Sequence, residues 1–145
     1  MAETAFSIKV IGDSPCTGRL TIGEFTETFD LNCSRWTTED YRLSWTQALR
    51  ELLVDPGGRV VLMTWCCPPP EVGVQRAWVL FHEGESVFVQ ERIFVPGEHV
   101  SPIAPTGELM DPGPRVPCND LGEPVSEWVT SVKAIDAFLQ KESRS

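Results

Sequence analysis

Hydrophobic and polar residues alternate near the start of the chain in the manner of a β-strand. In residues 5–11, AFSIKVI, the side chains of Phe6, Ile8 and Val10 share one face, and polar residues occupy the other. The turn-forming sequence GDSPCTG follows at residues 12–18. We therefore expect a strand that leads by a short loop into a second strand.

The next stretch, LTIGEFTETFD at residues 20–30, changes the parity of its apolar positions. Leu20 and Ile22 precede the change, and Phe25 and Phe29 follow it. The glycine between them, in the sequence IGE, is the natural place for one extra residue in a strand. The pattern predicts a single strand with a β-bulge at this glycine.

A helix is predicted over residues 38–53. Thr37 and Asp40 have the spacing of a capping box, and DPGG after the segment is a stop signal. The apolar residues recur at helical spacing and form one stripe: Tyr41, Trp45, Ala48, Leu49 and Leu52.

Three strands are predicted next, at residues 59–67, 75–83 and 85–95. The first two are apolar on both parities, which is typical of central strands covered on both faces. In the third, Glu91 interrupts a row of alternating apolar residues. A twist or bulge that turns Glu91 toward water is the favoured interpretation, and a buried, partnered carboxylate with a role is the alternative.

The remainder of the chain predicts a long loop and a second helix. Residues 96–124 are rich in proline and aperiodic. Ser126 is placed to cap a helix whose apolar stripe is Trp128, Val132, Ile135 and Leu139. The order is ββαβββ, loop, α, which predicts an α+β fold: one domain over residues 1–145, with an antiparallel sheet of about five strands and two amphipathic helices packed on it.

Composition narrows the class of protein. A chain of 145 residues with 41% hydrophobic residues and five tryptophans is typical of a globular domain. Apolar runs such as VVLM are far shorter than the roughly 18–20 residues of a membrane helix, and the first residues lack a secretory signal. Five scattered cysteines without a CxxC pair indicate buried thiols in a reducing compartment. We therefore expect a cytoplasmic protein without membrane association.

The net charge of −9 bears on the choice of partner. A nucleic-acid binder needs positive charge to displace counterions from phosphates, so direct nucleic-acid binding is not expected. Acidic residues are concentrated at 20–40 and 96–127, each stretch having a single arginine. Such surfaces steer basic partners, although negative charge also serves solubility alone.

Catalytic chemistry has little support in the sequence. The two histidines, His82 and His99, have no serine elbow, partner cysteine or metal-ligand spacing near them, and no phosphate-binding glycine loop is present. Glu24 and Glu27 form the kind of pair that any acidic strand provides. We expect no catalytic residues, no cofactor and no metal. Trp36 is predicted either to pack on Tyr41 as a hydrophobic staple or to anchor an interface.

The segments in this order resemble a known family. FSIKV, GRLTIGEFTETF, WTTEDYRLSWTQAL, AWVLFHE and VSEWVTSVKAIDAFL are similar to the immunity proteins of bacterial contact-dependent growth inhibition and related polymorphic toxin systems. The residues that match the pattern are interpreted mostly as fold markers: Gly23, Glu24, Phe25, Tyr41, Trp45 and Trp128.

The resemblance implies a cytoplasmic protein that binds one cognate toxin domain, commonly a nuclease, and blocks its active site or substrate surface. The acidic stretches supply the candidate toxin-binding residues: Glu24, Glu27, Asp30, Glu39, Asp40, Glu108, Asp111 and Asp120. Two alternatives stay open. One is a small enzyme or ligand-binding domain that uses Glu24, Glu27 or His82 in a cleft, and the other is an adaptor or secretion chaperone that does not inhibit its partner.

Overall fold

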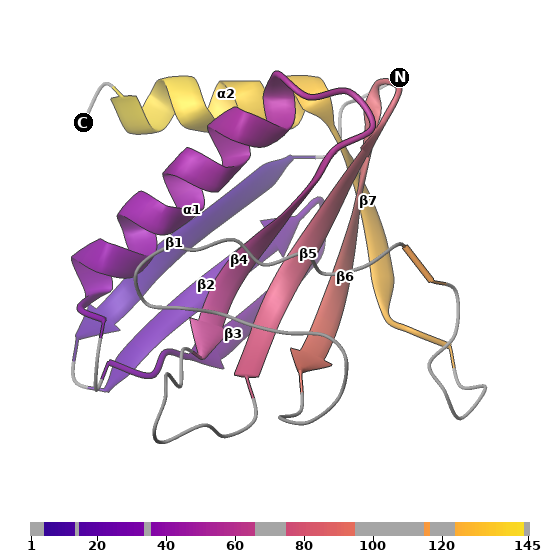
Figure 1. Ribbon diagram of the computed structural model, residues 1–145. Helices are drawn as coiled ribbons and strands as arrows, with labels where there is room; N and C mark the ends of the chain where they lie inside the picture. Colours follow the sequence, from indigo (N-terminus) through magenta and orange to yellow (C-terminus); the bar gives the residue numbers. More distant parts are fainter. Residues whose placement is uncertain are drawn as a thin grey trace.

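The computed structural model describes residues 5–13, 15–33, 36–65, 75–94, 115–116 and 124–143. Within them lie seven strands and two helices in the order β1β2β3α1β4β5β6β7α2. The strands form two antiparallel sheets, and the helices lie together on one side of the molecule (Figure 1). The predicted α+β class is confirmed, with the expected single sheet divided in two. The predicted 96–124 loop lies outside the described residues, apart from 115–116 and 124.

The first sheet has the order β1 (Phe6–Asp13), β2 (Cys16–Ile22) and β3 (Phe25–Asp30). The stretch predicted as one bulged strand is in fact two strands, because Ile22 pairs directly with Phe25 across a two-residue turn. Gly23 has φ 63°, the left-handed conformation that glycine adopts without strain. The parity change therefore comes from a hairpin, and the expectation of a bulge at Gly23 was wrong.

The second sheet has the order β4 (Arg59–Trp65), β5 (Gln75–Glu83), β6 (Ser86–Phe94) and β7 (Glu127–Ser131). Every β5 residue from Ala77 to His82 is buried, which confirms a strand covered on both faces. The β5–β6 register is regular through the pair Trp78 and Glu91. The bulge expected at Glu91 is therefore absent from this pairing.

Helix α1 (Thr38–Leu53) has the predicted bounds. The Thr37 hydroxyl accepts a hydrogen bond from the backbone N–H of Asp40 at 3.1 Å, and the Thr37 N–H donates to the Asp40 carboxylate at 2.8 Å. Both halves of the predicted capping box are thus present. Trp36 packs edge-on against Tyr41 at 5.0 Å between ring centroids, as the staple interpretation predicted.

Helix α2 (Val132–Ser143) starts later than its sequence predicted. Trp128 lies in β7, whose β-branched residues pair with β6 over Ser86–Gln90. The side chain of Ser131 accepts the N–H of Ala134 at 3.0 Å, so Ser131 rather than Ser126 caps the helix. The predicted apolar stripe is confirmed for Val132, Ile135 and Leu139, which pack in the core. Trp128 belongs to β7 instead.

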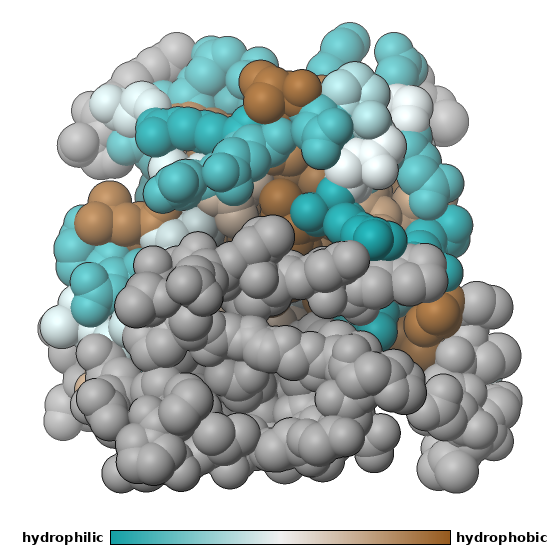
Figure 2. Space-filling view, viewed as in Figure 1, coloured by the Kyte–Doolittle hydropathy of each residue, from teal (hydrophilic) through white to brown (hydrophobic). Residues whose placement is uncertain are grey.

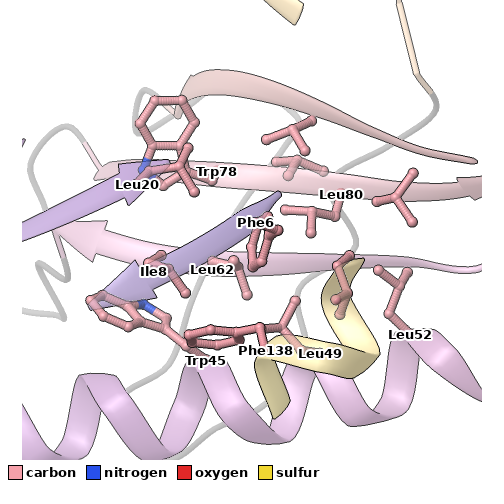
Figure 3. Packing of buried hydrophobic residues seen from close by; sticks show 14 of the residues in the cluster. Phe6, Ile8, Leu20, Trp45, Leu49, Leu52, Leu62, Trp78, Leu80 and Phe138 are labelled. Carbon is pink, nitrogen blue, oxygen red and sulfur yellow. The ribbon is translucent and has the colours of Figure 1, made fainter. Parts of the chain in front are cut away.

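One hydrophobic core joins both sheets and both helices. Figure 3 shows Trp45, Leu49 and Leu52 of α1 directed toward the strands, with Phe138 of α2 beside them. The N–H of the Trp45 ring donates to the carbonyl oxygen of Met63 at 2.7 Å, which satisfies its one buried polar atom. These contacts hold α1 against β4 of the second sheet.

The surface of the described residues has no continuous apolar patch in the view of Figure 2, which shows separate hydrophobic spots on a mostly hydrophilic face. The large exposed apolar side chains come from different elements: Ile11, Leu43, Val54 and Val129. On the described part of this face, polar and charged groups predominate.

Candidate functional site

A carboxylate stands on the core-facing side of β3. In the hairpin, Glu27 pairs with Leu20 while Phe25 pairs with Ile22, so Phe25, Glu27 and Phe29 share the face that looks toward the second sheet. Their side chains are half-buried, whereas the alternate residues of β3 are exposed. The sequence thus places a charged group in an otherwise aromatic row.

Glu27 lines a cleft between the two sheets, with a volume of about 190 Å³. Strand β3 forms one wall, and residues of β4, β5 and β6 form the other. The lining residues are Glu27, Thr28, Phe29, Asp30, Thr64, Arg76, Ala77, Trp78 and Glu91. Among the described residues, three acidic side chains and one arginine therefore line the cleft, and they come from β3, β5 and β6.

Glu27 of the first sheet and Glu91 of the second sheet meet in this cleft. Burial raises the pKa of Glu27, and the charge of Glu91 and a hydrogen bond to its side chain raise it further. Glu91 itself is exposed, as the favoured interpretation of a side chain turned toward water expected.

Aromatic rings form a fixed floor beneath the carboxyl groups. Phe29 contacts Trp78 edge-on at 6.0 Å and Trp45 at 6.3 Å between centroids, and Phe25 stacks on Trp128 at 4.1 Å. Trp78 and Trp45 are almost completely buried. Phe29 and Trp78 line the cleft themselves, so these ring contacts connect it to the hydrophobic core.

Arg76 is the single cation among the described residues that line the cleft. Its backbone carbonyl accepts a hydrogen bond from the Thr64 hydroxyl at 3.2 Å, which ties β5 to β4 at this point. Its side chain is exposed and forms no ion pair with Glu27, Asp30 or Glu91 in the described structure. The described residues that line the cleft therefore carry a net negative formal charge.

The structure separates the predicted site residues. Glu27 and Asp30 lie together in the cleft, whereas Glu24 is exposed in the β2–β3 turn. Asp40 is held in the capping box, and the Glu39 carboxylate accepts a hydrogen bond from Arg42 at 2.6 Å. Three further predicted residues lie outside the described part of the chain: Glu108, Asp111 and Asp120.

Sequence reasoning missed Arg76, and it predicted correctly that Glu91 is exposed to water, although without the bulge that it offered as one cause. The interrupted apolar row of β6 was the signal that could have identified Glu91, since a charged residue in regular register on the core-facing side needs a partner or an opening to water. No comparable signal marked Arg76. Its place in the cleft follows only from the arrangement of the two sheets.

His82 lies elsewhere in the fold. The side chain is buried, with Nδ1 2.9 Å from the carbonyl oxygen of Leu52 and Nε2 3.1 Å from that of Gly84. It does not line the acidic cleft. Of the three residues named for the alternative of an enzyme or ligand-binding domain, Glu27 lines this cleft, and His82 and Glu24 do not.

Neither metal ligands nor membrane spans stand out among the described residues. No cluster of three or more histidine, cysteine, aspartate or glutamate side chains is suited to hold a metal ion there. None of the described helices has the length and apolar character needed to cross a membrane.

Comparison with known protein families matches residues 31–138 to CdiI_N, the CdiI N-terminal domain. The chain belongs to this CdiI family. The resemblance to immunity proteins of contact-dependent growth inhibition is thereby confirmed. No curated protein matches the sequence. The family segment begins directly after β3, so the CdiI match includes the wall of the cleft with Glu91 and Arg76 but not the wall with Glu27.

The CdiI assignment agrees with the fold of a solved structure. A chain of the "CdiA-CT/CdiI toxin and immunity complex from Enterobacter cloacae" superposes with a TM-score of 0.72 at 22% sequence identity. The alignment covers 97% of this chain and 99% of that chain. The likeness therefore extends to both sheets and shows a shared fold.

Proposed function

We propose that this CdiI-family protein is an immunity protein that binds one cognate toxin domain and neutralises it in the cytoplasm of the cell that makes both. The family match over residues 31–138 carries the proposal. The shared fold with a chain of a toxin and immunity complex supports it. The protein itself performs no catalysis in this account and acts by covering a surface of the toxin.

The partner is a basic domain, and we expect a nuclease. The net charge of −9 and the acidic cleft favour a cationic surface as the complement. A nuclease needs positive side chains to hold phosphates. An acidic protein that occupies those side chains excludes the nucleic acid, so inhibition follows from blocking the active site or the adjacent substrate surface.

The cleft between β3 and the second sheet is the best candidate for the contact surface. Glu27 and Glu91 line it from the two sheets, together with Phe29 and Trp78, and the exposed Asp30 lies at its edge. Glu39 and Asp40 are less available to a partner, because both carboxylates already accept hydrogen bonds within α1 and its cap. We therefore centre the toxin contact on β3, with Glu24 at its periphery.

Titration of the purified toxin domain encoded beside this gene tests the proposal. Its activity should vanish as the protein reaches equimolar amounts, and a toxin of the same catalytic class from another pair should keep its activity. The association rate should fall steeply with salt, because long-range attraction between exposed charges is screened. If the toxin kept its full activity when this protein was present in molar excess, the immunity function would be refuted.

A further inference from the structure

The first sheet has a polar face that looks away from the hydrophobic core. Alternate residues of its strands, such as Ile8 and Leu20, point inward and are buried, so the residues between them point outward. Two successive rows of outward residues cross the three strands. The first row is Ser7, Thr21 and Thr26, and the second row is Lys9, Arg19 and Thr28.

Two cations stand directly opposite each other on this outward face. Lys9 of β1 pairs with Arg19 of β2 in the antiparallel register, and both residues are exposed. Neither side chain forms an ion pair with another described residue, and this includes Asp30 in the row beyond Arg19. Like charges that face each other across two strands destabilise a sheet. In a chain with 21 acidic and 12 basic residues, this opposed pair of cations is therefore unfavourable until an anionic group binds to it.

We propose that the outward face centred on Lys9 and Arg19 is a second docking surface, which binds carboxylate side chains of the cognate toxin domain. The ammonium and guanidinium groups donate charge-assisted hydrogen bonds to carboxylate oxygens, and the hydroxyl group of Thr28 beside Arg19 is a further donor. The two rows contain no aromatic ring on which bases could stack. This composition favours a protein surface over a single-stranded nucleic acid.

Strand β3 lies between this docking surface and the acidic cleft. Glu27 faces the cleft, whereas Thr26 and Thr28 face the opposite side of the strand. Because β3 is the edge of the first sheet, a toxin domain that docks across it reaches both surfaces.

The inference rests on the proposed function and adds a second, oppositely charged contact to it. The cleft attracts basic groups of the toxin, and the pair of Lys9 and Arg19 attracts acidic ones. A toxin with basic groups at both places would be repelled by the cations. The two signs together therefore set the orientation of the cognate toxin and discriminate against other basic toxins.

Reversal of single charges separates a local contact from the effect of net charge. Lys9→Glu, Arg19→Glu and the control Arg50→Glu, on the exposed side of α1, each make the net charge of −9 more negative by two units. Long-range attraction of a basic toxin should therefore be kept or increased in all three variants. We expect titration calorimetry to show affinity reduced at least about tenfold in Lys9→Glu and Arg19→Glu, and wild-type affinity in Arg50→Glu.

Urea unfolding of the free variants gives a second readout. Lys9→Glu and Arg19→Glu each replace two opposed like charges by two opposed unlike charges, so the urea midpoint should rise above that of the wild type. Weaker binding by a more stable protein cannot come from damage to the fold.

Two results would overturn the docking surface. One is an affinity in both variants equal to that of Arg50→Glu, and the other is a urea midpoint that falls together with the affinity. In either case, binding and neutralisation by the wild type would leave the immunity function standing. A wild-type protein that did not bind the toxin would overturn both proposals.

Discussion

The Nδ1 atom of His82 lies 2.9 Å from the carbonyl oxygen of Leu52, in the last turn of α1. Its Nε2 atom lies 3.1 Å from the carbonyl of Gly84, in the β5–β6 turn. The backbone of His82 also bonds the loop after α1, accepting from Gly57 at 3.0 Å and donating to Gly58 at 2.9 Å. One residue therefore ties the end of the helix to the second sheet.

Replacement of His82 by alanine should destabilise the protein. The change leaves two carbonyl partners without the ring and creates a cavity, so we expect a loss of about 2–4 kcal/mol in the free energy of unfolding. Urea unfolding measures it. Glu85→Ala, an exposed change in the adjacent turn, should stay within about 0.5 kcal/mol of the wild type. A His82→Ala protein as stable as this control would contradict the structural role.

The capping box of α1 gives a second prediction. Thr37→Ala removes the hydroxyl that accepts the Asp40 N–H and should lower the free energy of unfolding by about 1 kcal/mol. Thr37→Ser keeps the hydroxyl and should retain most of the stability. Equal loss in both variants would show that the methyl group, rather than the cap, matters at this position.

The β2–β3 turn depends on the left-handed backbone of Gly23. Gly23→Ala should cost about 1–2 kcal/mol, because a Cβ atom is unfavourable at φ 63°. Gly23→Asn should cost less, since asparagine tolerates this conformation better. Thermal or urea unfolding distinguishes the two variants. Alanine and asparagine proteins of equal stability would argue against the conformational explanation.

Glu127 gives a prediction for the pH dependence of stability. A bidentate hydrogen bond from Arg115, at 2.7 Å to each carboxylate oxygen, lowers the pKa of Glu127, and Gln90 adds a further bond at 2.9 Å. This contribution to stability is present above the ordinary glutamate pKa of about 4.3 and is lost as the pH falls through the folded value.

Glu127→Gln should therefore be less stable than the wild type at pH 7, and the difference should shrink in acid. Urea midpoints measured from pH 7 down to pH 2.5 check this expectation. Asp136→Asn, at an exposed carboxylate on α2, serves as the control without an arginine partner. A difference between Glu127→Gln and the wild type that is constant over this range would contradict the ion-pair explanation.

Local signals in the sequence predicted the parts of the fold that depend on local interactions. The bounds of α1 follow from its apolar stripe and from Thr37 and Asp40, all within one segment. The β2–β3 hairpin was missed because a two-residue turn and a bulge produce the same parity change at Gly23. The last strand was missed because Trp128 also fits a helical stripe, and only pairing with β6 places it in a sheet.

The candidate site was predictable in part for the same physical reason. Glu27 stands out as an acid among the core-facing residues of its strand, and Asp30 is exposed at the end of that strand. Their association with Glu91 and Arg76 depends on how two sheets face each other, and residues so far apart in sequence carry no signal of that proximity. The three predicted acids beyond residue 96 remain predictions.

Affinity for the cognate toxin domain, measured by titration calorimetry on two charge-reversal pairs, tests the central claim most directly. Asp30→Lys/Glu91→Lys changes the cleft, and Glu51→Lys/Asp136→Lys makes the same change in net charge on the exposed faces of the helices. Unfolding midpoints verify that both proteins are folded. We predict that the cleft pair weakens binding at least about tenfold more than the helix pair. Equal weakening by both pairs, or wild-type affinity in the cleft pair, would contradict the account.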